Sequence, residues 1–254
     1  RRFCLKRHAR RLKPRLKRWS EHEDLDLRAL AMMSLHFAHG ENRQTRDFLI
    51  AHLEKDKQAS LLRARWVLAL SHLAGVYRER NEFALARGTY EKALELKPDD
   101  ATVHFNLGLT YHQQGGFTRA IASFEKALAT EPNDPITLVN LGIARRRNGE
   151  ARLAVAAYER ALAAYPHHAL AYFNLGNVYY ESAELEQAIS AYQKATELDP
   201  SLSNAYFFLA RAYLKSKQAE PAARALRAGL HYAPEDEDAR KMLNDVEAYL
   251  SQSR

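Results

Sequence analysis

The sequence predicts an all-α protein in which antiparallel helix pairs stack one after another into a solenoid. Three observations predict this fold class. Short amphipathic segments alternate with turns along most of the 254 residues, the block Asn-Leu-Gly returns every 34 residues from Asn106, and prolines recur at the same spacing. Those prolines are Pro98, Pro132, Pro166, Pro200 and Pro234. A period of this length with two helices in each unit is typical of repeat proteins, whose units pack mainly on their neighbours.

The positive charge of the chain is concentrated at its N-terminus. The formal net charge is +7, yet residues 1–18 contain ten Lys or Arg and no acid, which leaves 28 basic against 31 acidic residues in the remainder. Three interpretations of the arm at residues 1–19 stay open: a solvated arm, a juxtamembrane segment that binds an anionic membrane surface, and a nucleic-acid arm. We rank nucleic acid last, because no aromatic platform accompanies the charge.

The composition bounds the compartment. Cys4 is the only cysteine, so no intrachain disulfide can form and a reducing compartment fits. The sequence contains neither an apolar run long enough to cross a bilayer nor a signal-peptide core. We therefore expect a cytoplasmic protein, or the soluble domain of an inner-membrane-anchored one. The chain begins with Arg rather than Met, and we expect further sequence upstream.

Residues 20–58 are predicted to form a degenerate helical repeat. The pattern S-x-x-E at residues 20–23 is a capping box for a helix that continues to about Ala38. Gly40 suits the end of that helix, and a second helix is expected from about residue 44 to 55.

The helix at residues 59–79 is predicted to be longer than its later counterparts. If Gly40 and Asn81 occupy equivalent turns, they lie 41 residues apart, which is seven more than the period. Because seven residues make two helical turns, this helix should gain about two turns.

Five regular units follow within residues 59–234, numbered here so that the closing proline is position 32. They cover about residues 67–98, 101–132, 135–166, 169–200 and 203–234. Position 8 is always Gly or Ala, and position 24 is Tyr, Phe or Leu. Small residues let the two helices approach closely while bulky ones fill the groove beside them. Asp134 and Pro135 suit the start of a helix. Residues 235–254 are predicted to add a capping helix, with Met242, Leu243, Val246, Tyr249 and Leu250 on its apolar face.

This pattern resembles the tetratricopeptide repeat (TPR) family over residues 67–234. The resemblance implies a right-handed α-solenoid whose first helices line a concave groove. One departure concerns position 11, which is Tyr in four units and Arg145 in the middle one. We expect a local change in packing or a polar contact there, with the stem of Arg145 covering apolar surface and its head reaching water.

The resemblance also implies that positions 2, 5, 6, 9, 12 and 13 face the groove. The residues expected to bind a partner are Phe105, Asn106, His112, Gln113, Val139, Asn140, Arg146, Arg147, Phe173, Asn174, Asn177, Tyr180, Phe207, Arg211 and Lys215. Among them, three phenylalanines are expected to form an exposed apolar stripe. The four cations are expected either to form a basic rim that steers an acidic segment or to be merely solvated.

Asn106, Asn140 and Asn174 form a ladder at position 6. An amide offers both a donor and an acceptor, which matches the backbone of an extended peptide. The ladder resembles that in the repeat region of O-linked N-acetylglucosamine transferases, where such asparagines hold peptide backbone. The alternative is that each asparagine hydrogen-bonds the neighbouring repeat.

The sequence gives no indication of an enzyme. We find no phosphate-binding glycine loop, no nucleophile motif and no metal-ligand spacing, so no cofactor is expected. His36 and His39 could share a helix face, but no third ligand is near them, and His167 with His168 lies in a loop.

We therefore expect a scaffold that binds a partner peptide or helix in the groove. The first alternative is an assembly module of a membrane-anchored bacterial secretion or exopolysaccharide-export complex, such as the Pel system, and the second is a nucleic-acid-binding repeat protein. Chaperone C-terminal tails are not expected as partners, because the family's clamp for them needs Lys at position 5 and no unit has it. Self-association is left open.

Overall fold

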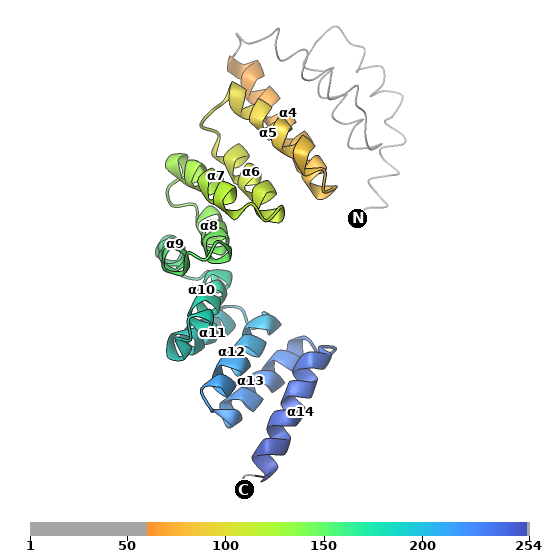
Figure 1. Ribbon diagram of the computed structural model, residues 1–254, viewed down its shortest axis with the longest axis vertical. Coiled ribbons are helices and arrows are strands. Elements are labelled where there is room, and N and C mark those ends of the chain that lie inside the picture. Colours follow the sequence, from red (N-terminus) through yellow and green to blue (C-terminus); the bar gives the residue numbers. More distant parts are fainter. Residues whose placement is uncertain (1–59, 253–254) are drawn as a thin grey trace. The chain divides into compact units, whose positions relative to one another are not determined.

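The computed structural model describes residues 60–252, and every regular element within that range is an α-helix (Figure 1). The helices are α4 (Ser60–Glu79), α5 (Phe83–Leu96), α6 (Ala101–Gln113), α7 (Phe117–Thr130), α8 (Pro135–Arg147), α9 (Ala151–Ala164), α10 (Ala169–Glu181), α11 (Leu185–Leu198), α12 (Ser203–Lys215), α13 (Ala219–Tyr232) and α14 (Glu237–Gln252). The chain divides into unit 1, residues 1–114, and unit 2, residues 115–254. The basic arm, the degenerate repeat at residues 20–58, and His36 and His39 lie outside the described residues.

The first described helix has the extra length that the sequence predicts. Helix α4 contains 20 residues, whereas α6, α8, α10 and α12 contain 13 each. The difference is seven residues, or two helical turns, so the prediction for residues 59–79 is confirmed.

A residue in the left-handed conformation ends the first helix of each of the five repeats. Position 15 of the repeat has a positive φ in all five: Asn81 62°, Gly115 74°, Gly149 82°, Ala183 61° and Lys217 61°. In four of them the next N–H donates to the carbonyl of position 11, as from Glu150 to Arg145 at 2.9 Å. This is the Schellman arrangement, which satisfies carbonyls at a helix end. These four turns are therefore built the same way, although only Gly149 among their position-15 residues is a glycine.

Helix starts follow local capping chemistry. The carboxylate of Asp134 accepts hydrogen bonds from the backbone N–H of Thr137 at 2.8 Å and from its hydroxyl at 2.5 Å, and Pro135 opens α8. This confirms the predicted cap. Asp100 and Asp236 accept from backbone N–H groups three residues ahead in the same way, at 3.0 and 2.8 Å.

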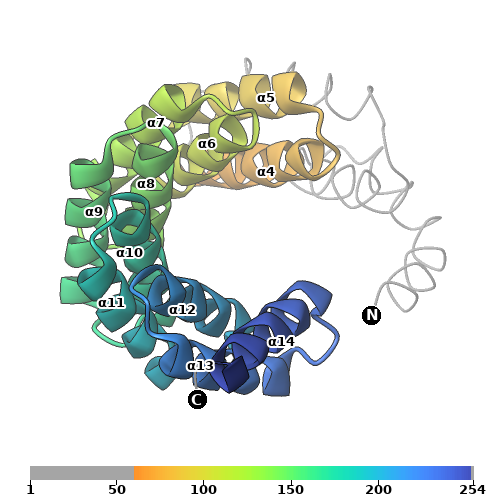
Figure 2. The same ribbon diagram turned by 60° about the horizontal axis from the view of Figure 1, so that its bottom comes forward.

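In unit 2 the helices form two layers. Figure 2 shows α8, α10 and α12 along the inner side of the curved stack, which we call the inner layer, and α9, α11 and α13 along its outer side. The position-24 side chains Tyr158, Tyr192 and Leu226 are fully buried between the layers. In unit 1, Tyr90 is equally buried in a core with Trp66.

The C-terminal helix α14 packs on the last repeat as a cap. Val246 is buried, and Met242, Leu243 and Leu250 pack against the same core. The Arg227 guanidinium on α13 contacts the Glu247 carboxylate at 2.6 Å. Tyr249 was expected on the apolar face, but its side chain is 61% exposed.

Candidate partner-binding surface

The ladder asparagines hydrogen-bond their own helices. On α8 and α10, Asn140 Nδ2 donates to the Ile136 carbonyl and Asn174 Nδ2 to the Leu170 carbonyl, each at 2.8 Å. In unit 1, Asn106 Nδ2 donates to the Thr102 carbonyl at 3.0 Å. All three bonds span four residues along one helix, so none is the bond to a neighbouring repeat that we considered as the alternative. They hold each amide in one orientation and leave its oxygen for another donor.

Exposed apolar side chains accompany the asparagines of unit 2. Ile136 is 56% exposed and Leu170 is 49% exposed, and each precedes its asparagine by four residues. At 100° per residue, Ile136 and Asn140 lie on the side of α8 opposite Gly142, which packs against α9. Sequence reasoning assigned position 2 to the groove but selected none of its residues. The sequence signal that could have identified Ile136 and Leu170 is an apolar residue at position 2 in consecutive repeats.

The residues at positions 2, 6, 9 and 13 of α8, α10 and α12 are called the inner stripe below. On α10 the stripe contains Leu170, Asn174, Asn177 and Glu181. On α12 it contains Asn204, Phe208, Arg211 and Lys215. It therefore changes from apolar or amide side chains at the N-terminal ends of these helices to charged side chains at their C-terminal ends.

The position-5 phenylalanines do not form the exposed stripe that we predicted. Phe105, Phe173 and Phe207 are all only partly exposed, and Val139 is buried. The Phe173 ring packs against Tyr192 and Phe208, with centroids 5.9 and 5.5 Å away. The Phe173 ring fills space between helices because position 5 lies nearer the helix-helix contact than positions 2 and 6 do. A Cβ built on Gly229 would lie 2.5 Å from the Phe207 ring, which identifies that ring as packing too.

Two cations from α12 lie over aromatic rings. The Arg211 guanidinium carbon is 5.2 Å from the Phe208 ring centroid and 5.6 Å from that of Tyr180 on α10. Lys215 Nζ is 4.8 Å from the same Tyr180 centroid. These distances are in the range of cation–π attraction. Both cations are therefore positioned by α10 rather than simply solvated.

Arg146 is not part of an open basic rim. Its guanidinium contacts the Glu181 carboxylate at 2.5 Å, linking α8 directly to α10, and the arginine side chain is only 19% exposed. The neighbouring Arg147 is exposed. Of the four cations that we expected at the rim, one is thus neutralised within unit 2.

A buried tyrosine fixes the side chain of Asn177, one of the residues of the inner stripe. The Tyr192 hydroxyl donates to Asn177 Oδ1 at 2.8 Å. Burial raises the pKa of that hydroxyl well above its ordinary value, and the Arg211 guanidinium offsets part of the effect. Asn177 therefore has a structural role in addition to its place in the stripe.

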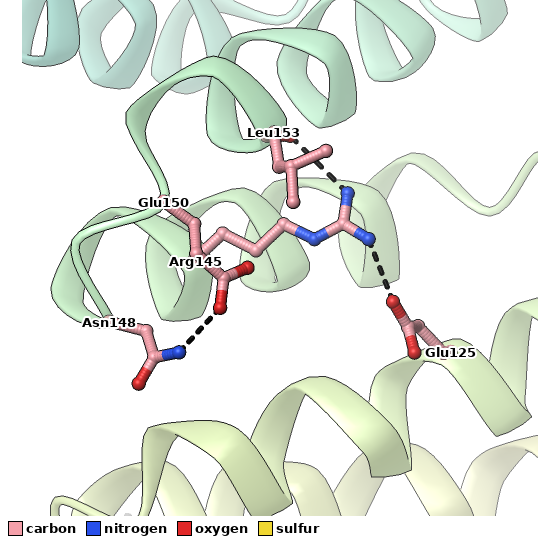
Figure 3. A network of polar contacts seen from close by, with 5 residues as sticks. All are labelled: Glu125, Arg145, Asn148, Glu150 and Leu153. Atoms are coloured by element: carbon pink, nitrogen blue, oxygen red, sulfur yellow. Dashed lines mark hydrogen bonds and ion pairs between the residues drawn. The ribbon is translucent and has the colours of Figure 1, made fainter.

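Arg145 replaces the usual position-11 tyrosine by a polar bridge (Figure 3). One guanidinium nitrogen donates to Glu125 on α7 at 2.7 Å and the other to the Leu153 carbonyl on α9 at 3.3 Å. The side chain is 16% exposed, so its stem is covered. The predicted polar contact is confirmed, but the head reaches a carboxylate and a carbonyl rather than water.

Unit 1 contributes a separate hollow of about 470 Å³ between α4 and α6. Its lining includes Leu68, His72, Thr102 and Asn106. The predicted residues His112 and Gln113 lie at the end of α6, where His112 is partly exposed and Gln113 is exposed.

Over residues 60–252, no group of three His, Cys, Asp or Glu side chains could hold a metal ion. Tyr165 packs edge-on against His168, with centroids 5.9 Å apart, so that histidine is part of an inter-repeat turn. In the same range, no helix combines the length and the apolar character that a membrane span requires.

Four family models match the repeats described above. A TPR repeat model matches residues 75–115, and tetratricopeptide repeat models match residues 101–134, 139–203 and 181–246. The chain belongs to the tetratricopeptide repeat family. TPR proteins are generally non-catalytic scaffolds, and none of the four models describes a catalytic family.

Solved TPR structures share this fold. A crystal structure of MamA is 27% identical with a TM-score of 0.60, and the match covers 65% of this chain and 96% of the chain in that structure. MamA from Desulfovibrio magneticus RS-1 is 22% identical with a TM-score of 0.61, covering 67% and 97%. YrrB, described as a TPR protein with an unusual peptide-binding site, is 23% identical with a TM-score of 0.60, covering 76% and 96%. A comparison with curated proteins gave no match.

Proposed function

We propose that this protein is a non-catalytic scaffold that binds a peptide or helix of a partner protein on the inner layer of its repeats. One observation carries the proposal: α8 and α10 each present an exposed apolar side chain beside an amide fixed in orientation. Exposed apolar side chains that recur in register on adjacent helices are typical of protein-binding surfaces. The membership of the chain in the TPR family supports the same function.

The asparagines supply the polar part of this surface. Because Asn140 and Asn174 use one amide hydrogen on their own helices, the oxygen and the second hydrogen are left for the backbone of a bound segment. Fixing the amide in advance lowers the conformational entropy lost on binding. A peptide can then be held without any requirement for its particular side chains at these points.

A matched pair of leucines tests the proposal. Leu170 on the inner helix α10 and Leu153 on the outer helix α9 are each 49% exposed. Binding peptides are selected from a displayed random library with the full chain, and their affinities are measured by calorimetry. Leu170→Asp should weaken binding by at least tenfold, and Leu153→Asp should leave it unchanged. Equal effects of the two variants, or an unaffected Leu170→Asp, would contradict binding on the inner layer.

Replacing all three ladder asparagines by alanine tests the amide contribution. Because none of them bonds a neighbouring repeat, the triple variant should keep its thermal stability, and alanine favours helix slightly. The affinity for the selected peptides should fall by about tenfold, as expected for losing one or two net hydrogen bonds. Unchanged affinity would move the binding site away from the ladder.

The basic arm supports two finer proposals. Ten Lys or Arg in residues 1–18 would attract anionic lipid, as in a cytoplasmic assembly module of a membrane-anchored export complex. Co-sedimentation with phosphatidylserine vesicles that is lost on deleting residues 1–18 supports this role. The second finer proposal is that the arm binds nucleic acid. Nucleic-acid binding that weakens steeply with added salt, and is lost on deleting residues 1–18, would support it.

A further inference from the structure

The C-terminal edge of the inner stripe carries positive charge without a matching carboxylate. Arg211 and Lys215 are both exposed, and within residues 60–252 no carboxylate lies at ion-pair distance from either. The one acid of the stripe nearby, Glu181, is paired with Arg146. This contrasts with Arg145, Arg146 and Arg227, each of which contacts a glutamate.

The two cations lie beside the same aromatic ring. They are four residues apart on α12, a spacing at which like charges repel and destabilise a helix. Both nevertheless lie over the Tyr180 ring, at 5.6 and 4.8 Å from its centroid. The attraction of the ring offsets part of the repulsion and limits the movement of both side chains. An anion bound between them would remove the repulsion and use two donors that are already positioned.

The surroundings of this pair suit a protein carboxylate better than a phosphate backbone. Residues 115–252 contain 15 Lys and Arg against 17 Asp and Glu, so unit 2 lacks the excess positive charge on which nucleic-acid binding depends. On the same stripes, Leu170 and Asn174 offer an apolar contact and an amide. These match a peptide that carries an acidic and an apolar side chain on one face.

We propose that Arg211 and Lys215, braced on Tyr180, bind an Asp or Glu carboxylate of an acidic segment in the partner protein. The inference rests on the proposed function, since it concerns the chemistry of the segment that the inner layer binds. The apolar side chains of that segment would lie toward Leu170 and Ile136, and its acid toward the C-terminal ends of α10 and α12. The surface thus distinguishes acidic partner segments from neutral or basic ones.

The experiment uses the full chain and the displayed random peptide library. Peptides selected by the natural sequence should be enriched in Asp and Glu. Their affinity should fall by at least about tenfold in the double variant Arg211→Glu/Lys215→Glu, as expected for loss of a charge-assisted contact. The double variant Arg211→Gln/Lys215→Gln guards against a folding effect and should also bind weakly. A matched reversal on outer helices, Arg152→Glu/Arg224→Glu, should leave affinity unchanged.

The possible results separate the two proposals. The selected peptides could lack acidic enrichment and bind Arg211→Glu/Lys215→Glu with normal affinity, yet still depend on Leu170 and the ladder. That result would overturn this inference and keep the proposed function. A library that returns no binder, or only binders indifferent to Leu170, would overturn both. The natural sequence could also bind a 20-nucleotide oligothymidylate. If this binding is lost in Arg211→Glu/Lys215→Glu but kept in Arg152→Glu/Arg224→Glu, the two cations bind phosphate groups, which overturns the inference.

Discussion

Gly142 on α8 lies directly against the ring of Tyr158 on α9. A Cβ placed on this glycine would be 2.5 Å from Tyr158 Cε1, 2.7 Å from Cζ and 2.8 Å from Cδ1. The tyrosine is fully buried, so its ring cannot retreat into solvent. Gly176 and Tyr192 repeat the arrangement one unit later, with ring carbons at 2.7 Å. The predicted role of position 8, a close approach of the two helices in a pair, is confirmed.

Gly142→Ala should lower the free energy of unfolding by about 1–3 kcal/mol, the usual cost of overpacking a well-filled core. Gly88→Ala is the control. Gly88 also lies within a helix, but a Cβ there meets no atom within 4 Å, so alanine should gain up to about 1 kcal/mol from helix propensity. Denaturant midpoints of both variants measure the difference. A destabilised Gly88→Ala, or a neutral Gly142→Ala, would contradict the packing argument.

Ala183→Gly should stabilise the protein. Ala183 has φ 61°, a left-handed conformation that costs an L-residue about 1 kcal/mol and costs glycine much less. The reciprocal variant Gly149→Ala, at φ 82° with open space around its Cβ position, should destabilise by a similar amount. The shifts in thermal midpoint should therefore have opposite signs, and shifts of the same sign would refute the conformational explanation.

Strong alkali should unfold the protein through its buried tyrosines. Burial raises the pKa of Tyr90 to about 12 and raises those of Tyr158 and Tyr192 further. Between pH 10 and 12 the unfolded tyrosine loses its proton while the folded one keeps it. The native state then binds more protons, so stability falls as the pH rises, by up to about 1.4 kcal/mol per pH unit for each tyrosine. Denaturant titrations across this range should show a shallower fall for Tyr90→Phe, and an identical slope would contradict the assignment.

Arg145→Ala should lower the free energy of unfolding by about 1–2 kcal/mol. The substitution removes both the covered stem and the bridge between Glu125 and the Leu153 carbonyl. Glu125→Gln isolates the ionic part and should cost under about 1 kcal/mol, decreasing with added salt. Equal losses in the two variants would mean that the stem contributes nothing.

Val246→Asp should loosen the capping helix. Val246 is buried against the last repeat, whereas Asn244 on the same helix is exposed. Burying an unpaired carboxylate is costly, so α13 and α14 should lose amide-exchange protection in Val246→Asp. Asn244→Asp adds the same charge at the surface and should retain protection. Loss of protection in both variants would point to charge rather than burial.

The packing of this protein could be read from its period, and the polar contacts of the candidate surface could not. Positions 8 and 24 meet at Gly142 and Tyr158 and again at Gly176 and Tyr192, so one spacing argument covers both pairs. The partner of Arg146 depends instead on how far α10 is rotated against α8, and no single-residue pattern specifies that rotation. The same holds for the placement of Arg211 over Tyr180.

Two other differences between the sequence prediction and the structure arise within a single helix. The asparagine amides return to the carbonyl four residues back, a short-range option open to Asn in any helix, so their bond to Ile136 or Leu170 was within reach of sequence reasoning. The phenylalanines were assigned to solvent because position 5 was grouped with position 6. One residue on a helix is a rotation of 100°, which is enough to move Phe173 from the surface into contact with Tyr192.

The bond between Arg146 and Glu181 has a mechanical consequence. It joins α8 and α10, two consecutive helices of the inner layer, without passing through α9. Any motion that separates α8 from α10 must therefore stretch this ion pair as well as open the core between the layers. The pair thus acts as a short link that resists separation of these two repeats, and added salt should weaken it.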